Sequence, residues 1–136
     1  KNKGLIMSKE IILNDYAFFF FETDLEGNII FANDDFCEIA GYSVDELINQ
    51  PHNIIRHSDM PKAAFKQVWD TLKSDKVWEG LVKNSTKDGN YYWVFATIYP
   101  TITSVGEKGY ISCRKKPSRK EILKYEAIYK ELKDKE

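Results

Sequence analysis

Residues 27–36 read Gly27-Asn28-Ile29-Ile30-Phe31-Ala32-Asn33-Asp34-Asp35-Phe36. In this stretch a glycine turn is followed by four residues of strand composition and then by Asn33, a residue type that commonly caps helices. The preceding residues 17–23 are rich in phenylalanine, which also favours a strand. The pattern predicts two strands joined by a turn at residues 24–28, and a helix that Asn33 caps and that continues to Ala40.

The rest of the chain carries helix caps and turn residues at short intervals. Two capping boxes each place a serine three residues before a glutamate, and an Asp-Gly pair supplies the positive φ angles of a hairpin turn. Strand runs on both sides of a helical block predict an α+β fold, in which helices cover one face of an antiparallel sheet. The further expected elements are helical turns over residues 8–14, a short helix from 43, a longer helix over 61–74, strands over 77–86, 91–101 and 108–115, and a last helix from 118.

Composition argues against several classes of function. The chain has 136 residues, which suits one domain, and 20 Lys+Arg against 21 Asp+Glu leave a net charge of −1, so no attraction to nucleic acid is expected. No apolar run reaches the roughly 20 residues of a membrane-spanning helix, and no leader pattern stands at the start. A cytoplasmic protein without direct membrane insertion is therefore expected. Cys37 and Cys113 lack the spacing of a metal site or redox pair, and no catalytic motif indicates an enzyme.

The segment before the longer helix concentrates polar side chains. It reads Pro51-His52-Asn53-Ile54-Ile55-Arg56-His57-Ser58-Asp59-Met60-Pro61 and contains both histidines of the protein. Taken singly, each polar residue has an ordinary structural explanation; Asp59, for example, is placed to cap the following helix. Together, Arg56 and His57 suit a phosphate or another anion, while nearby tryptophans suit a flat ring.

One strand places a polar side chain on its apolar face. In residues 77–86 the alternation puts Val82 and Asn84 on one face, and Glu79 and Lys83 on the other. The charged face is expected to be exposed, so Asn84 points its carboxamide into the core, where an unpaired amide costs on the order of 1–3 kcal/mol. Its hydrogen-bond partner is either a group of the protein itself, such as another side chain or a loop backbone, or the amide-like edge of a ligand.

These segments resemble a known family. Residues 27–36, the stretch Gly41-Tyr42-Ser43-Val44-Asp45-Glu46-Leu47 and the closing hairpin resemble a PAS domain. More narrowly, residues 50–65 resemble the aerotaxis-receptor (Aer-type) PAS domains, which bind FAD, and further matches are Trp69, Trp78-Glu79-Gly80 and Val82-Lys83-Asn84. The resemblance covers roughly residues 17–115. Ser58 is a departure, since that family usually has proline at this position.

The resemblance implies a five-stranded antiparallel sheet whose inner face, enclosed by helices, holds FAD. Asn84 and Asn33 would bond the polar edge of the flavin ring, and Trp69 would pack on it. Arg56 and His57 would position the pyrophosphate or adjacent polar groups, and Asp59 would organise the loop. The implied cofactor contacts are therefore Asn33, Arg56, His57, Asp59, Trp69 and Asn84.

The function implied by the resemblance is a redox or oxygen sensor for energy taxis. Such a sensor would signal the redox state of its flavin to a chemotaxis-type receptor or signalling domain. The corresponding division of the chain is an N-terminal extension with a short helix over residues 1–16, a PAS sensor domain over 17–116, and a C-terminal connecting helix over 117–136.

Three alternatives differ from this interpretation. A light-oxygen-voltage domain needs an Asn-Cys-Arg motif, which the chain lacks. A haem-binding gas sensor would use His52 or His57, although the common pattern places its histidine on the longer helix, where residues 61–74 have none. A ligand-free interaction module is the third. Residues 91–99 are apolar on both faces, so a terminal helix or a second subunit is expected to cover the outer face, and a homodimer through the sheet is expected in either case.

Overall fold

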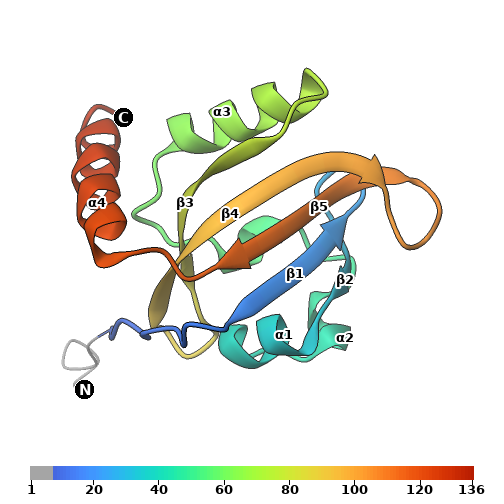
Figure 1. Ribbon diagram of the computed structural model, residues 1–136, viewed down its shortest axis with the longest axis horizontal. Helices are drawn as coiled ribbons and strands as arrows, with labels where there is room; N and C mark the ends of the chain where they lie inside the picture. Colours follow the sequence, from blue (N-terminus) through green and yellow to red (C-terminus); the bar gives the residue numbers. More distant parts are fainter. Residues whose placement is uncertain (1–7) are drawn as a thin grey trace.

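The computed structural model describes residues 8–136, in which five antiparallel strands form one sheet packed against helices (Figure 1). The strands lie side by side in the order β2-β1-β5-β4-β3. This architecture confirms the α+β fold and the five-stranded sheet expected from the sequence. In chain order the elements are β1 Phe18–Thr23, β2 Ile29–Ala32, α1 Asp34–Ala40, α2 Val44–Leu47, η2 His52–Ile55, α3 Lys62–Lys73, β3 Trp78–Ser85, β4 Tyr91–Ile102, β5 Lys108–Lys115 and α4 Arg119–Asp134.

Helix boundaries follow the capping signals of the sequence. Asn33 caps α1 by accepting a hydrogen bond from the backbone N–H of Phe36, and Gly41 ends the helix with a φ of 82°. Both capping boxes form, at Ser43 before α2 and at Ser118 before α4. The polar segment that the sequence predicts as a loop contains the short 3-10 helix η2.

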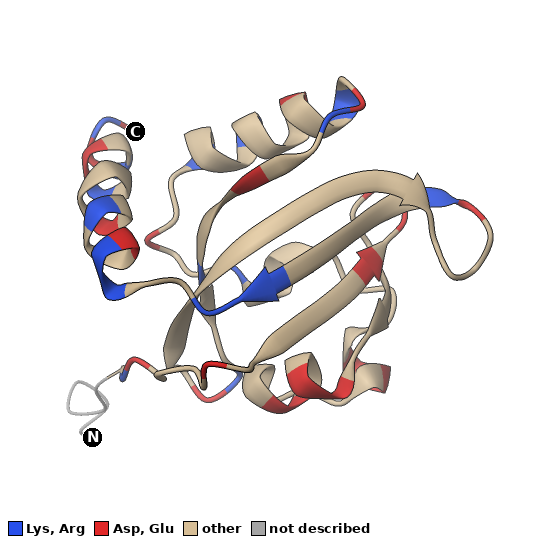
Figure 2. Cartoon of the chain, viewed as in Figure 1, with Lys and Arg blue, Asp and Glu red and all other residues tan. Residues whose placement is uncertain are grey.

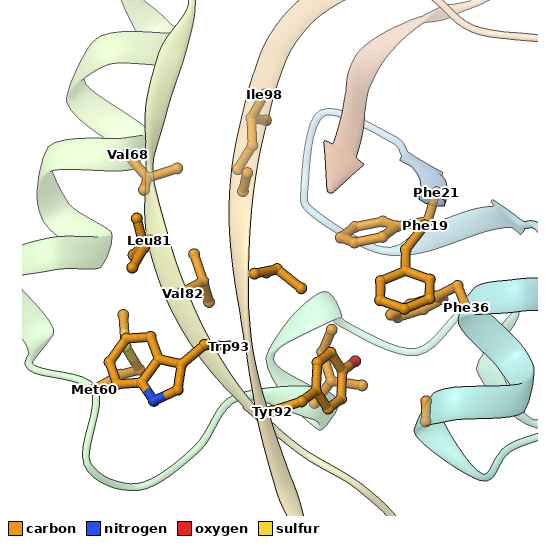
Figure 3. Packing of buried hydrophobic residues seen from close by; sticks show 14 of the residues in the cluster. Phe19, Phe21, Phe36, Met60, Val68, Leu81, Val82, Tyr92, Trp93 and Ile98 are labelled. Atoms are coloured by element: carbon orange, nitrogen blue, oxygen red, sulfur yellow. The ribbon is translucent and has the colours of Figure 1, made fainter. Parts of the chain in front are cut away.

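The inner face of the sheet, which is covered by α1, α2, η2 and α3, holds most of the core. Figure 3 shows Tyr92 and Trp93 pointing to opposite sides of β4, Tyr92 towards the inner face and Trp93 towards Met60. Phe36 of α1 is fully buried and stacks on Phe21 of β1 with ring centroids 5.1 Å apart. This aromatic packing fixes α1 against the sheet.

The last helix, α4, packs on the outer face, where it covers β3 and β4. The ring of Tyr129 stacks on Trp93 at 6.2 Å, and the Tyr129 hydroxyl donates to the backbone carbonyl of Leu81 at 2.7 Å. Leu81 is therefore buried, although its charged neighbours on β3 predict an exposed face. The sequence analysis expected either a terminal helix or a second subunit on the outer face. Over β3 and β4 it is the terminal helix that covers this face.

The prediction of helical turns over residues 8–14 is wrong. These residues are extended, and the backbone of Tyr91 donates to the carbonyl of Lys9 at 3.0 Å and accepts from the N–H of Ile11 at 2.7 Å. The physical reason is an open edge: the pairing of β5 with β4 ends at Phe95, which leaves Tyr91 without a strand partner on that side. The first seven residues of the expected N-terminal extension lie outside the described residues.

Charged residues gather on the helices and loops, and the sheet carries few of them (Figure 2). The helix α4 alternates both signs along its length, and three of its pairs lie four or three residues apart. Arg114 on β5 departs from this distribution because it is buried.

Candidate cofactor site

Strands β3, β4 and β5 bring polar side chains to the inner face of the sheet. On β5 the alternation turns Tyr110, Ser112 and Arg114 inward, and all three are buried. Asn84 on β3 and Tyr92 on β4 are register partners and are buried as well. The inward position of Asn84 agrees with the prediction from the sequence.

Three of these buried side chains carry polar atoms without a hydrogen-bond partner, namely Asn84 Nδ2, Tyr92 Oη and Arg114 Nη1. The Tyr92 hydroxyl lies near Asn84 and Arg114 without a hydrogen bond of acceptable geometry. Burial raises the pKa of Tyr92 to about 12, so its hydroxyl is neutral at pH 7. Unpaired polar atoms in a core cost free energy, so these three atoms are available to pair with a group that enters this face.

Arg114 is the buried cation of this face. Its Nε donates to Ser112 Oγ at 2.8 Å, and its guanidinium carbon lies 4.7 Å from the centroid of the Phe21 ring. Burial lowers the pKa of Arg114 to about 10, which still leaves the side chain charged at pH 7. Among the described residues, no carboxylate forms an ion pair with it.

A small cavity of about 20 Å³ lies beside Arg114, between the sheet and α3. Trp69 and His52 form one wall, with ring centroids 5.7 Å apart, and Tyr110 meets Trp69 edge-on at 5.6 Å. Gly27 permits this packing, because a Cβ atom there would lie 3.2 Å from the Trp69 ring and 3.1 Å from His52. The wall is therefore aromatic and tightly packed.

His52 contributes no charge to this wall at neutral pH. Burial, together with the positive charges of Arg114 and Arg56, lowers the pKa of His52 to about 4. Its imidazole is therefore neutral at pH 7. The inner cavity combines aromatic walls, neutral hydrogen-bonding groups and one permanent positive charge.

Residues 56–60 run along the free edge of β3. Arg56 forms an isolated antiparallel bridge with Asn84, and the N–H of His57 donates to the carbonyl of Lys83 at 3.2 Å. The N–H of Lys83 in turn donates to Met60 Sδ at 3.4 Å. The polar segment thus satisfies backbone groups that an edge strand would otherwise leave open.

Asp59 links this segment to β3 through its side chain. Its carboxylate accepts from Lys83 Nζ at 2.8 Å, which lowers the pKa of Asp59, and its own N–H donates to His57 Nδ1 at 2.9 Å. Burial, followed by the charge of Lys83, lowers the pKa of His57. The prediction that Asp59 caps the next helix is wrong, because Lys83 holds its carboxylate; Pro61 stands at the N-cap of α3 without a side-chain hydrogen bond.

Arg56 stands next to Asn84 through their backbone bridge. Its guanidinium carbon lies 3.5 Å from the centroid of the Phe65 ring, a cation–π contact with α3. Its Nε is buried without a hydrogen-bond partner, and burial lowers the pKa of Arg56. The side chain therefore retains hydrogen-bonding capacity for an anion.

Asn33 is occupied by the protein backbone. Its Oδ1 accepts from the N–H groups of Phe20 and Phe36, both at 3.1 Å, and its Nδ2 donates to the carbonyl of Phe18 at 3.1 Å. The residue both caps α1 and fastens that helix to β1. Its role as a helix cap, the ordinary explanation from the sequence, is confirmed.

The structure brings most of the predicted site residues to two neighbouring places. At one end of β3 and along its edge lie Arg56, His57, Asp59 and Asn84. Trp69 stands on the wall of the inner cavity, whereas Asn33 is held at the start of α1. Sequence reasoning missed three buried polar residues of the inner face, Tyr92, Ser112 and Arg114, and considered His52 only as a haem ligand. Alternation along residues 108–115 was the available signal for two of them, since it places Ser112 and Arg114 on the same face as Tyr110.

Comparison with known proteins identifies the family of this fold. The PAS fold family matches residues 29–113. The chain belongs to the PAS family. The aerotaxis receptor of Escherichia coli (strain K12) is 46% identical to this PAS domain over 110 residues, which cover 81% of the chain and 22% of the receptor. The nitrogen fixation regulatory protein of Klebsiella oxytoca is 36% identical over 85 residues, which cover 62% of the chain and 17% of that protein.

The chain thus spans about a fifth of the length of these curated relatives. A solved PAS domain of a protein from Colwellia psychrerythraea superposes on it with a TM-score of 0.60 and 22% sequence identity. The superposition covers 77% of this chain and 91% of that one, and it supports the PAS fold independently of sequence.

Two further properties of the PAS domain bear on its chemistry. Between residues 8 and 136, none of the helices has the length and apolar composition needed to cross a membrane. Over the same range, His, Cys, Asp and Glu side chains form no group of three that could hold a metal ion. Neither Cys37 on α1 nor Cys113 on β5 lines the inner cavity.

The donors of the inner face fit a flavin ring. Asn84, Tyr92 and Arg114 offer neutral and charged partners for its polar edges, and the aromatic wall suits its flat body. A cavity of about 20 Å³ is smaller than a three-ring system, so the side chains around it leave space for only part of such a ring. The chemistry of these side chains therefore suits a flavin, although the cavity is smaller than the whole ring.

Proposed function

We propose that this PAS domain binds FAD and acts as a redox or oxygen sensor for energy taxis. The observation that carries the proposal is the inner face of the sheet, where Asn84 and Tyr92 have unpaired buried atoms and Arg114 lines an aromatic cavity. The polar edge of a flavin can satisfy such atoms while its rings replace the contacts of the wall. The 46% identity to an aerotaxis receptor supports the same assignment.

Each predicted site residue has a distinct task in this proposal. Asn84 orients the polar edge of the ring, and Trp69 packs against the ring. Arg56 and His57 bind the pyrophosphate or adjacent polar groups, with Asp59 keeping the segment in place through Lys83. Asn33 is assigned a contact as well, although its carboxamide already makes three hydrogen bonds with the backbone.

Bound FAD would supply reversible electron transfer, with a change of charge and protonation on its ring. Asn84 would respond because its amide pairs with the ring edge. The backbone of Asn84 is bridged to Arg56, and the preceding residue on β3, Lys83, is hydrogen-bonded to His57 and Asp59. A rearrangement at Asn84 would therefore reach the polar segment and the edge of β3.

The first experiment is the absorbance spectrum of the freshly purified protein, followed by mass identification of any compound released on denaturation. Two flavin bands that bleach on reduction, together with released FAD, are the expected result. A single intense Soret band would replace FAD by haem. A colourless protein that takes up no added FAD would favour the ligand-free interaction module.

Substitution of Asn84 tests the assigned site. In Asn84→Ala the ring edge loses a buried partner, so FAD affinity should fall about 5- to 150-fold, which corresponds to about 1–3 kcal/mol for an unsatisfied buried group. The matched control is Ser85→Ala, the next residue on β3, whose side chain makes no hydrogen bond with another described residue. Equal FAD affinity and an unchanged spectrum in Asn84→Ala would contradict the site.

The proposed receiver of the signal is a chemotaxis-type receptor or signalling domain, and the proposed assembly is a homodimer through the outer face of the sheet, in the cytoplasm. The supporting feature is the part of the outer face on β1 and β2, which α4 does not cover. There the ring centroid of Phe20 lies 6.4 Å from that of Phe18 and 5.9 Å from that of Phe31. Phe18 and Phe31 are 49% and 41% exposed, an unusual arrangement for adjacent aromatic residues on a sheet.

Light scattering over a range of concentrations tests this assembly. The unaltered protein should have the mass of a dimer, and Phe18→Glu should weaken dimerisation at least tenfold by placing a charge in the apolar contact. Leu25→Glu is the control, since Leu25 is equally exposed but lies in the turn after β1. A monomeric mass at every concentration would overturn the proposed dimer.

A further inference from the structure

We propose that Arg114 sets the reduction potential of the bound flavin, because its buried guanidinium offers an uncompensated positive charge to the ring as the ring gains electrons. This inference rests on the proposed function and adds to it a residue and a measurable property. It concerns the central strand β5 of the sheet.

The position of Arg114 is unusual for a charged residue. It is 4% exposed, and its strand neighbours are Phe19 on β1 and Ala96 on β4, both buried. Buried guanidinium groups normally face carboxylates or form several hydrogen bonds. Arg114 has one hydrogen bond, from Nε to Ser112, and its Nη1 has no partner.

The groups around Arg114 do not neutralise its charge. His52 lies across the cavity and is neutral at pH 7, since its pKa is about 4. The Tyr92 hydroxyl is also neutral, with a pKa of about 12. The Ser112 hydroxyl and the face of the Phe21 ring, which also contact Arg114, have no charge. The cavity therefore has a net positive charge that an anionic group inside it would offset.

Two-electron reduction of a flavin provides such an anion. An external reductant, dithionite in the test below, gives two electrons and is itself oxidised, and water supplies one proton to the ring. The ring then has one net negative charge, which it lacks in the oxidised form. A nearby cation in a low-dielectric cavity lowers the free energy of the reduced form more than that of the oxidised form, so it raises the reduction potential.

The test compares FAD-loaded protein with Arg114→Met and Arg114→Lys. The measurement is the midpoint potential in an equilibrium titration against a reference dye. In Arg114→Met the affinity for reduced relative to oxidised FAD should fall at least tenfold, which is about 30 mV for a two-electron couple. Arg114→Lys retains the charge and should remain nearer to the unaltered protein.

Lys115→Met is the matched control. Lys115 is the next residue on β5 and loses the same charge, but it is exposed and its side chain lies on the opposite face of the sheet. Solvent screens its charge from the cavity, so the midpoint potential should not change. An equal shift in Lys115→Met and Arg114→Met would show a general charge effect and overturn the role of Arg114.

Stability without FAD separates this role from a structural one. Removing a buried charge that has no counter-charge should leave the thermal midpoint of Arg114→Met equal to or above that of the unaltered protein. A structural Arg114 would instead give a lower midpoint in both Arg114→Met and Arg114→Lys. If Arg114→Met does not fold, Arg114→Gln replaces it as the neutral variant in the potential measurement.

The outcomes also separate the two proposals. If the unaltered protein takes up no FAD, the proposed function fails and this inference fails with it. If FAD binds and the midpoint potentials of the unaltered protein and the neutral variant agree, FAD binding stands and the role of Arg114 is overturned. A lower potential in the neutral variant alone supports both.

Discussion

Tyr129 on α4 donates its hydroxyl hydrogen to the backbone carbonyl of Leu81 on β3, at 2.7 Å and in a buried environment. Two residues along the same edge, the carbonyl of Lys83 accepts from the N–H of His57. The last helix and the polar segment therefore hold neighbouring carbonyls of one edge strand. A shift of β3 at either carbonyl is transmitted to the other through the rigid strand between them.

Tyr129→Phe should loosen α4. The substitution leaves the Leu81 carbonyl buried without a partner, which costs about 1–3 kcal/mol. Hydrogen exchange of α4 amides should become faster, and the free energy of unfolding should fall by that amount. Tyr125→Phe is the control, because Tyr125 lies one turn earlier and its hydroxyl makes no hydrogen bond with another described residue. Equal effects of the two substitutions would show that the hydrogen bond to Leu81 is not the cause.

Phe36→Ala should be strongly destabilising. Phe36 is fully buried and stacks on Phe21, so the truncation leaves a cavity and costs about 3–5 kcal/mol. Denaturant unfolding measures this value. Phe31→Ala removes the same side chain from a position that is 41% exposed and should cost clearly less in dilute protein. A Phe36→Ala loss as small as that of Phe31→Ala would contradict the packing of α1.

Acidification should destabilise the fold through His52. Its pKa is about 4 in the folded protein against an ordinary 6.5, so between these values the unfolded chain binds a proton that the folded one does not. The stability that this group contributes is complete above pH 6.5 and is lost as the pH falls to about 4, by up to about 3 kcal/mol. Denaturant unfolding between pH 4 and pH 7.5 measures it.

His52→Gln provides the comparison for that experiment. Glutamine does not titrate, so the difference in unfolding free energy between the two proteins isolates the histidine from the carboxylates. Asp59 acts in the same direction at lower pH, because its lowered pKa also favours the folded state until it is protonated. Parallel pH profiles for the two proteins would show that His52 is not desolvated.

Two substitutions of Asn33 separate its structural role from a contact with FAD. Asn33→Ala removes the cap and the clamp on β1, and should cost about 1–2 kcal/mol of stability. Asn33→Asp keeps the acceptor for Phe36 but loses the donor to the Phe18 carbonyl, so its cost should be smaller. A loss of FAD affinity in Asn33→Asp at full stability would support a direct contact.

Local signals in the sequence predicted most of the fold. The strand expected over residues 108–115 has those bounds in the structure, and the turn at Gly89 adopts a positive φ of 89°. Such signals depend on neighbouring residues, as capping boxes and hairpin turns do. The prediction of a helix over residues 8–14 failed because these residues pair with the open edge at Tyr91, which lies far away in the sequence.

The candidate site was predicted in part for the same reason. Asn84 could be placed inward because β3 alternates regularly. The binding of Asp59 to Lys83 could not be predicted, since only folding brings these residues within 2.8 Å. Arg114 required knowledge that both strands beside β5 are present, because a charge on an edge strand could have reached water.

The two segments that lead into and out of the sheet are joined directly. The carboxylate of Glu10 forms a bidentate ion pair with Arg119 at the start of α4, and Asp15 forms an ion pair with Lys116 at 3.0 Å. A pulling force applied between these segments would therefore act first on the ion pairs and on the bridge of Glu10 to Tyr91. The five strands lie outside that line of tension for as long as these contacts hold.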